Sequence, residues 1–387
     1  EDEIFFYLAR YRYIVPQGSI LAGVGDYYRQ VTLSNCYVVP LYDSYGGICA
    51  TDQFITAISK RRGGVGFDLS NLRPEGLVVK NNARTTSGAV SFMERFSNTG
   101  REVGQNNRRA ALMITLSIHH PDIEKFITVK SDLKKVTGAN ISVRLSNEFL
   151  VALKNDAEYE LRWPLINPTI SRKIKAKYIW DKLIRMAHDN AEPGIINWDK
   201  IIEESPADCY ASLGYETTST NPCSELPLSN FDSCRLLCLN LYSYIEKPFT
   251  KDSYFDYNKL YEHAQIAQRL MDDVIDLELE CIDGILKKIE NDPEPDYIKQ
   301  LEFDLWNNIR SACFNGRRTG TGITGLGDCL AALGIKYGSK KSIDVSEEIY
   351  RTLKFGCYRG SVDMAVELGP FPAWRFELEK DNTFLNR

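Results

Sequence analysis

Alternating helical and strand-like segments are the feature that most limits how this 387-residue chain can fold. Residues 31–39 and 108–116 contain runs of β-branched, aliphatic and aromatic residues, which predict strands. Residues 45–62, 178–191 and 256–289 carry apolar positions at helical spacing and predict helices. Helices that alternate with strands over most of a chain favour an α/β architecture, in which the connections cross over a sheet or barrel.

Shorter segments extend the same alternation, and no internal repeat, low-complexity segment or linker interrupts it. Residues 4–15 are expected to be the end of a helix, and residues 89–101 and 344–368 are expected to be helices. Further strands are expected at 195–198 and 234–242. The glycine-rich stretch 322–327 resembles a nucleotide-binding loop only superficially, so we interpret it as a site of close helix packing.

Composition and charge exclude several classes of function. Hydrophobic residues make up 43% of the chain and charged residues 26%, which is typical of a globular protein with a substantial core. The net charge of −5 provides no basic field for nucleic acid, and no apolar run is long enough to cross a bilayer. No secretory signal opens the chain, so we expect a cytoplasmic protein that binds neither nucleic acid nor membrane. The chain begins at Glu1 and stops at Arg387 without a closing element, which suggests a fragment.

Ten cysteines are present, and most are expected to be reduced in a chain without an export signal. They are Cys36, Cys49, Cys209, Cys223, Cys234, Cys238, Cys281, Cys313, Cys329 and Cys357. They form no paired C-x-x-C motifs, and the four histidines at 119, 120, 188 and 263 lie away from them in sequence. We therefore expect no metal site, while redox or radical use of a few cysteines stays open.

The stretch Asn221-Pro222-Cys223-Ser224-Glu225 carries the strongest chemical signal. If proline and the turn residues form a tight loop, the amide and the carboxylate reach the same volume as the sulfur. This combination suits a hydroxylated substrate, because the sulfur abstracts or transfers, the carboxylate moves a proton, and the amide donates hydrogen bonds. The alternative is a proline-containing loop with a buried cysteine, which would be favoured if the motif stood alone.

A second group of polar residues surrounds the helix expected at 45–62. Asp43 and Ser44 precede this helix and are good N-cap residues, which is compatible with ligand contact. Residues 79–88 are polar and include two positive charges. Such a loop could bind a phosphate, or it could be an ordinary solvated connection.

Taken in order along the chain, these motifs resemble the large catalytic subunit of ribonucleotide reductase, from about residue 4 to the end. The resemblance rests on four blocks, which are Asn221 to Glu225, Ser34-Asn35-Cys36 with the apolar strand that follows, Asp232-Ser233-Cys234-Arg235-Leu236 with the strand that follows, and Arg108 through His119-His120-Pro121-Asp122-Ile123. Each block is weak alone, whereas all four in this order are specific.

The resemblance implies a ten-stranded α/β barrel of the ribonucleotide reductase type, with residues 221–225 as a finger loop inside it. On this basis residues 1–387 are a partial catalytic barrel domain. They lack the N-terminal ATP-sensing domain and the C-terminal part of the family's catalytic subunit. We expect that this chain cannot close the barrel alone and is inactive by itself.

The resemblance also implies roles for five catalytic residues. Cys223 would become a thiyl radical that takes the 3′ hydrogen of the ribose, Glu225 would act as the base on the 3′ hydroxyl, and Asn221 would hydrogen-bond the sugar hydroxyls. Cys36 and Cys234 would supply two electrons and close to a disulfide, which requires Cα atoms within about 7 Å. We expect the three sulfurs to converge in one sheltered pocket.

Substrate and effector positions follow from the same resemblance. Ser34 and Asn35 join Asn221 and Glu225 as expected substrate-binding residues. A deoxynucleoside triphosphate or ATP would bind an allosteric site made of Asp43, Ser44, Tyr45, Lys60, Arg73, Lys80, Asn81 and Arg108. The helices expected at 45–62 and 89–101 would form the contact of a homodimer.

The radical source is open between two possibilities. One is adenosylcobalamin, which the forms Asn-Pro-Cys and Asp-Ser-Cys-Arg-Leu favour, and the other is a separate small subunit with a di-metal centre. Thioredoxin or glutaredoxin would be the external reductant, and the substrate would be a ribonucleoside di- or triphosphate.

Two other functions compete with this interpretation. One is a catalytically inactive nucleotide-binding regulatory protein of the same fold. The other is a thiol–disulfide oxidoreductase that uses Cys234 and Cys238, which would require an exposed thiol of low pKa. Arg235 is the one obvious cation beside those cysteines in the sequence, so this function ranks last.

Overall fold

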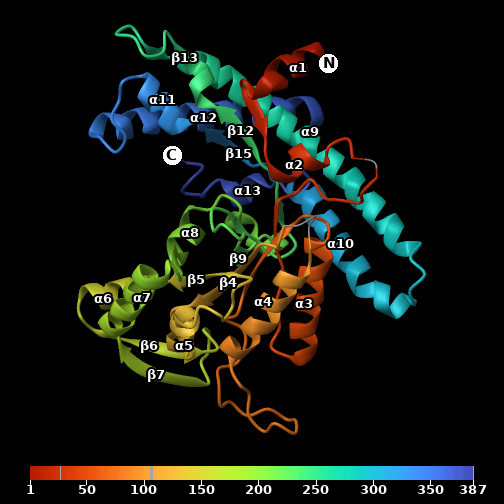
Figure 1. Ribbon diagram of the computed structural model, residues 1–387, viewed down its shortest axis with the longest axis vertical. Helices are drawn as coiled ribbons and strands as arrows, with labels where there is room; N and C mark the ends of the chain where they lie inside the picture. The colour runs from red at the N-terminus through yellow and green to blue at the C-terminus, as the bar shows by residue number, and fades with distance from the viewer. Residues whose placement is uncertain (27, 105–107, 387) are drawn as a thin grey trace. The chain divides into compact units, whose positions relative to one another are not determined.

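The computed structural model describes residues 1–26, 28–104 and 108–386, which divide into two compact units (Figure 1). The first unit consists of Glu1–Asn35, Cys234–Ile285 and Arg310–Trp374. The second unit consists of Cys36–Ser233, Leu286–Ile309 and Arg375–Arg387.

A parallel sheet forms the centre of the second unit. Its strands follow one another in the order β2 (Cys36–Val38), β3 (Gly64–Asp68), β4 (Leu112–Ser117), β5 (Asn140–Leu145) and β8 (Gly194–Asn197), and each neighbouring pair is parallel. Every residue of β4 is buried, as expected for a strand covered on both faces. The sequence predicts this α/β arrangement correctly.

Helices connect the parallel strands of this sheet. They are α3 (Tyr45–Ser59), the 3₁₀ turn η2 (Ala89–Phe92) leading into α4 (Met93–Glu102), α5 (Ile123–Thr128) followed by η3 (Val129–Ser131), α6 (Asn147–Lys154) and α7 (Ala176–Asn190). Figure 1 shows α3 and α4 side by side next to the strands. Ser44 caps α3 by accepting a hydrogen bond from the Gly47 amide at 3.0 Å, as expected for this residue.

Other elements of the second unit lie after β5. The antiparallel hairpin β6 (Glu158–Trp163) and β7 (Ile170–Lys175) separates α6 from α7, and α8 (Trp198–Glu204) and η4 (Asp208–Leu213) follow β8. Two short antiparallel strands, β9 (Ser219–Thr220) and β10 (Pro227–Leu228), enclose residues 221–226. The helix α13 (Phe376–Glu379) also belongs to this unit.

The first unit contains a three-stranded sheet and long helices. The sheet has the order β1 (Ile14–Pro16), β12 (Leu237–Asn240), β15 (Thr321–Thr324). The helices are α1 (Asp2–Leu8), η1 (Ala9–Tyr11), α2 (Gly18–Gly23), η5 (Leu241–Tyr244), α9 (Tyr257–Glu290), α10 (Asp296–Gly316), α11 (Leu326–Ala332) and α12 (Lys340–Leu368), and a short hairpin joins β13 (Ile245–Glu246) to β14 (Tyr254–Phe255). α9 and α10 have residues in both units. Leu239, Leu260, Ala264, Met271 and Ile349 are fully buried in the core of this unit.

Several expected boundaries are wrong. The strand expected at 31–39 is reduced to β2, and Cys36 is its first residue instead of lying in mid-strand. Thr32, Leu33 and Ser34 donate hydrogen bonds to the buried Glu278 carboxylate, which satisfies these groups without a strand partner. The helix expected to end at 4–15 stops earlier, because residues 14–16 pair with β12.

The stretch 322–327 is a strand followed by a helix, and not a helix-packing site, because β15 pairs with β12 in parallel. Cys234 and Cys238 do not share one regular strand either. β11 (Ser233–Cys234) ends before Arg235, and β12 begins at Leu237.

Within residues 1–26, 28–104 and 108–386 the strands form separate sheets, and no closed ten-stranded barrel is found among them. Of the helices described, none combines the length and the apolar character that a membrane span requires.

Candidate active site

The stretch 221–226 forms the tight loop that the sequence predicts. The Ser224 amide donates to the Asn221 carbonyl at 3.0 Å, and the Asn221 amide donates to the Leu226 carbonyl at 3.1 Å. The Asn221 side-chain oxygen accepts a further hydrogen bond from the Leu226 amide at 3.0 Å. Ser224 has a φ of +65°, which turns the chain sharply after Cys223. Asn221 therefore fixes the loop through its backbone and its side chain.

The loop rests on β3, where two glycines leave room for it. A Cβ atom at Gly66 would lie 1.8 Å from the Thr220 carbonyl oxygen, and one at Gly64 would lie 2.8 Å from Cγ of Pro222. The Asn140 side-chain amide, at the start of β5, donates to the Pro222 carbonyl at 3.0 Å. The sheet thus supports the loop from below by close backbone contact.

A polar network fixes the strand that leads into the loop. Arg144 on β5 pairs with Asp68 at the end of β3 at 2.9 Å and donates to the Thr218 carbonyl at 3.2 Å. Thr115 on β4 donates to Asp68 at 2.8 Å and lies 3.3 Å from the Ser219 hydroxyl. Sequence reasoning missed these residues, although a charged residue at the end of an apolar parallel strand is a usable signal for a site.

Cys36 lies beside the loop. The Asn221 side-chain amide donates to the Cys36 sulfur at 3.3 Å, and the sulfur belongs to a residue that is 8% exposed. The pKa of Cys36 is raised to about 12, mainly because the thiol is buried. The Asn221 hydrogen bond lowers this pKa, and the charges of Glu225 and Cys223 make smaller raising contributions. The structure therefore brings Cys36, Asn221, Cys223 and Glu225 into one neighbourhood.

Cys223 stands at the tip of the loop and is exposed. Partial burial and the negative charge of Glu225 raise the pKa of this thiol, and the positive charge of Arg108 opposes them. The expectation that this thiol is sheltered is wrong for the residues described, because Cys223 is exposed. Arg108, which was expected in the effector site, is thus close enough to influence Cys223 electrostatically.

These environments predict a difference in alkylation. At pH 8 iodoacetamide should modify Cys223 well before Cys36, because Cys36 is buried and its pKa of about 12 keeps it protonated. Below that pKa, the thiolate fraction of Cys36 should rise about tenfold with each pH unit. Peptide mass spectrometry after timed labelling measures both rates, with urea-unfolded protein as the control in which both thiols react. Equal alkylation rates of Cys223 and Cys36 in the folded protein at pH 8 would contradict the difference in their environments.

The partner thiol Cys234 belongs to the other unit. It is 2% exposed, and a Cβ at Gly320 would lie 3.1 Å from its sulfur. Because Cys36 and Cys234 fall in different units, their pairing stays a prediction. The exposed thiol of low pKa that an oxidoreductase centred on Cys234 and Cys238 requires is not found, because Cys234 is buried and burial raises the pKa of Cys238.

Ser34 and Asn35, the other expected substrate-binding residues, already have protein partners. The Ser34 hydroxyl donates to Glu278 at 2.8 Å, and the Asn35 side-chain oxygen accepts from the Ser19 amide at 2.6 Å. Both contacts lie within the first unit. A substrate hydroxyl would therefore have to displace or extend these hydrogen bonds.

The expected effector residues are only partly brought together. Asp43 accepts from the Arg73 backbone amide at 3.0 Å and pairs with its guanidinium at 2.7 Å, and this pairing raises the pKa of Arg73. Ser44 and the exposed Tyr45 stand beside Asp43 at the start of α3. Lys60 caps the opposite end of this 15-residue helix, about 22 Å away at 1.5 Å per residue, and pairs with Glu302 at 2.6 Å. One chain therefore cannot place Asp43 and Lys60 on the same small ligand.

Lys80 and Asn81 lie in an exposed loop, as predicted. Asn81 accepts from the Ala83 amide at 2.9 Å through its side-chain oxygen, so it shapes the tip of the loop. Lys80 and Arg84, four positions apart, place positive charge on this tip.

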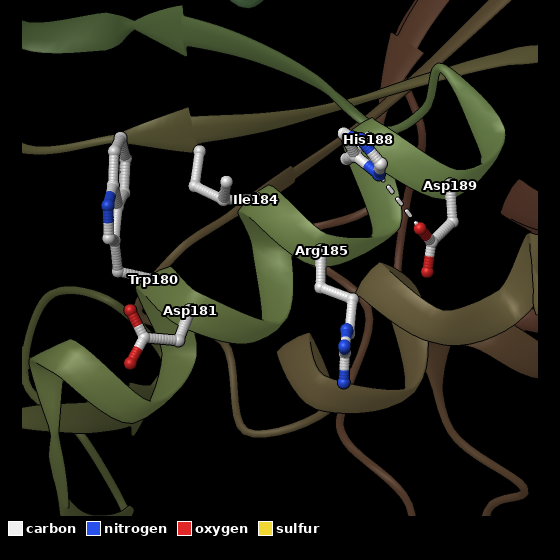
Figure 2. A pocket seen from close by; sticks show the side chains of 6 residues that line it. All are labelled: Trp180, Asp181, Ile184, Arg185, His188 and Asp189. Atoms are coloured by element: carbon white, nitrogen blue, oxygen red, sulfur yellow. Dashed lines mark hydrogen bonds and ion pairs between the residues drawn. The ribbon is translucent and has the colours of Figure 1, made fainter.

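A shallow hollow of about 390 Å³ lies on the outer face of α7 (Figure 2). Its lining comes from successive turns of that helix and consists of Trp180, Asp181, Ile184, Arg185, His188 and Asp189. The His188 ring pairs with its neighbour Asp189 at 3.0 Å, and none of the predicted site residues lines the hollow. The hollow is therefore separate from the site around Cys223.

Comparisons with known proteins identify the family of this chain. A family described as "Ribonucleotide reductase, barrel domain" matches residues 34–384. A vitamin B12-dependent ribonucleoside-diphosphate reductase of Thermoplasma acidophilum is 33% identical over 365 residues, which cover 93% of this chain and 43% of that protein. The protein of the same name from Mycobacterium tuberculosis is 30% identical over 344 residues, which cover 88% and 45%.

The fold also matches a solved structure. The class Id ribonucleotide reductase alpha subunit of Actinobacillus ureae aligns with a TM-score of 0.74 at 19% identity, over 96% of this chain and 61% of that one. The chain spans less than half the length of the curated relatives named above. Since the family match covers nearly the whole chain, this protein belongs to the ribonucleotide reductase barrel-domain family.

Proposed function

We propose that this chain is part of the catalytic barrel of a ribonucleotide reductase, which converts ribonucleotides to 2′-deoxyribonucleotides. The observation that carries the proposal is the contact between the Asn221 side-chain amide and the Cys36 sulfur at 3.3 Å. It joins a buried thiol to the loop that also bears Cys223 and Glu225. A thiol, a carboxylate and an amide around one small volume suit radical chemistry on a ribose.

The proposed reaction balances with the residues of this chain. The Cys223 thiyl takes the hydrogen atom from C3′ while Glu225 accepts the proton of the 3′ hydroxyl. The C2′–O bond then breaks, and the hydroxyl leaves as water with a proton from the Cys36 and Cys234 pair. The second hydrogen of that pair goes to C2′, so the pair loses two electrons and forms a disulfide. Cys223 then returns a hydrogen atom to C3′ and becomes a thiyl again, and Glu225 returns the proton to the 3′ oxygen. Thioredoxin or glutaredoxin would reduce the disulfide before the next turnover.

Asn221 has two tasks in this proposal. Its side-chain oxygen accepts from the Leu226 amide, and its side-chain amide donates to the Cys36 sulfur. Binding of the sugar hydroxyls would replace or share these contacts, which links substrate binding to release of the Cys36 thiol. Substrate would also cover the exposed Cys223, because the sulfur must be kept from water during the reaction.

The radical source is proposed to be adenosylcobalamin, since the two relatives at 33% and 30% identity are named as vitamin B12-dependent. Exposure of Cys223 at the loop tip fits a source that reaches the sulfur from outside the loop. Adenosylcobalamin, when bound, would supply the radical to this sulfur. A separate di-metal subunit is the alternative, and it too would have to reach Cys223.

The radical source can be tested directly. The intact protein is mixed with a ribonucleoside di- or triphosphate and dithiothreitol, with and without adenosylcobalamin, and deoxynucleotide is measured by chromatography. We expect product only when cobalamin is added, and we expect the 387-residue chain alone to give none. Turnover that needs a second subunit instead of cobalamin would contradict the cofactor, and no turnover under either condition would contradict the reductase function.

We also propose that the chain forms a homodimer that binds a deoxynucleoside triphosphate or ATP. Asp43 and Arg73 supply a carboxylate for the ribose and a cation for the phosphates. Because Lys60 lies at the far end of α3, it could join this ligand only from a second copy with α3 in the opposite direction. Sedimentation with and without the triphosphate tests the dimer, which a monomer under both conditions would contradict.

A further inference from the structure

Residues 76–88 form a hairpin that carries the charged tip described above. The Gly76 amide donates to the Thr86 carbonyl at 3.0 Å, and the Thr86 amide donates to the Leu77 carbonyl at 2.9 Å. Nearer the tip, the Val79 amide donates to the Arg84 carbonyl at 2.8 Å. These hydrogen bonds define the hairpin, but they do not attach it to the rest of the unit.

One side chain, Asp122, attaches both ends of the hairpin. Its two carboxylate oxygens accept from the Glu75 amide, each at 3.2 Å, and Oδ2 also accepts from the Ala89 amide at 2.9 Å. Gly88, with a φ of +88°, allows this approach, because a Cβ there would lie 2.6 Å from Asp122 Oδ2. Asp122 itself is 7% exposed, just before α5.

His120 orients Asp122 and also contacts Leu72, which lies shortly before the hairpin in the chain. The Asp122 amide donates to Nδ1 of His120 at 3.0 Å, and Nε2 of His120 lies 2.9 Å from the Leu72 carbonyl. A carbonyl can only accept and an amide can only donate, so His120 is neutral with its proton on Nε2. Burial lowers the pKa of His120, which favours this neutral form. Leu72 directly precedes Arg73, the cation that pairs with Asp43.

We propose that Asp122, oriented by His120, is the positioning residue that holds the 76–88 hairpin in the form that binds the triphosphate. The inference rests on the proposed effector site and adds a residue that does not touch the ligand. Lys80 and Arg84 carry like charges at a solvent-exposed tip, so they present a defined phosphate site only if the base of the hairpin is fixed. A hairpin ordered in advance binds with a smaller entropy cost, and its release lowers the fraction of protein that is competent to bind.

The test replaces Asp122 with asparagine in the intact protein. Asp122→Asn keeps the size of the side chain but puts an NH₂ group where an oxygen accepts from an amide. We expect hydrogen–deuterium exchange of residues 76–88 to become about tenfold faster and the Kd for ATP and dTTP to rise about tenfold. Exchange in β4 and β5 should stay as in the wild type.

The matched control is Asp132→Asn. Asp132 also accepts a backbone hydrogen bond, from the Lys134 amide at 3.0 Å, but it lies outside the hairpin. If Asp122→Asn unfolds the protein, Asp122→Glu decides, because it keeps the carboxylate and should restore part of the protection and affinity. Unchanged exchange at 76–88, or unchanged Kd with faster exchange, would overturn the inference.

Failure of the proposed effector site can be distinguished from failure of the inference about Asp122. If the wild-type protein binds neither ATP nor dTTP, the effector site is wrong and the ligand part of the inference falls with it. Exchange at residues 76–88 then still shows whether Asp122 orders the hairpin.

Discussion

Replacing Cys223 with serine should abolish ribonucleotide reduction in the intact protein, with a loss on the order of 10⁴-fold or more. The reason is chemical, since a serine hydroxyl does not form the radical that takes the 3′ hydrogen, and another sulfur at the loop, that of Met113, is a thioether 4.0 Å from the Ser224 hydroxyl. Cys36 is the nearest candidate, but it is buried beneath the loop and bonded to Asn221.

The substitution should leave the fold and nucleotide binding intact. Cys223 is exposed, so its replacement by serine should change the free energy of unfolding by less than about 0.5 kcal/mol. Cys209→Ser is the matched control, because Cys209 is a partly exposed cysteine whose thiol donates to the Pro206 carbonyl, outside the site. Turnover by product chromatography, effector Kd by calorimetry and thermal unfolding are measured for both variants.

The outcome separates the proposed function from its alternative. A catalytically inactive regulatory protein would show no measurable difference between the wild type and Cys223→Ser in any of these measurements. If the protein is a reductase, Cys223→Ser should abolish turnover and leave effector binding and thermal unfolding unchanged. Loss of effector binding together with turnover would instead show that the loop has a structural role, and the assignment of Cys223 as the radical residue would fail.

Local sequence predicts the elements of this fold where one pattern dominates. The helical spacing of apolar residues predicts α7 and α9 to within a few residues. The hairpin of β6 and β7 and the helix α10 were missed, although Tyr159 and Leu161 are buried at every second position of β6, as in a half-buried strand. The alternation of buried positions in β6 is therefore a local signal that predicts a strand.

Other errors could not be avoided from local sequence. The strand expected at 31–39 is interrupted because Ser34 bonds to Glu278, which lies 244 positions away in the chain. Asp122 bonds to Glu75 and Ala89, which lie 47 and 33 positions away, so its part in the 76–88 hairpin depends on tertiary contacts. By contrast, the pentapeptide at 221–225 was identified from its residue types, because a tight loop needs only local hydrogen bonds.

Gly66→Ala should disable the site without touching any reactive group. The new Cβ would lie 1.8 Å from the Thr220 carbonyl oxygen and 2.9 Å from its carbonyl carbon. Both are backbone atoms, so no side-chain rotation relieves the contact, and β9 must move by more than about 1 Å to restore van der Waals distance. Asn221 follows Thr220 directly, so its contact with the Cys36 sulfur should be lost.

The expected consequences are a lower turnover and a looser loop. A displacement of about 1 Å at a catalytic centre can reduce the rate about 10²-fold, and overpacking of this kind costs about 1–3 kcal/mol in the free energy of unfolding. Cys36 should also become more reactive toward iodoacetamide, because Asn221 and the loop no longer cover it. The effector Kd should change little, since Asp43 and Arg73 are held by their pairing with each other.

Gly327→Ala provides the matched control. Gly327 lies in α11 with no atom within 4 Å of the added Cβ, and alanine in a helix is favoured over glycine by about 1 kcal/mol. This variant should keep wild-type turnover and unfold at an equal or higher temperature. If Gly66→Ala also keeps wild-type turnover, the close contact between β3 and the loop is not needed for catalysis. The contact between Asn221 and Cys36 would then not be required by the mechanism, because the loop could shift without a loss of turnover.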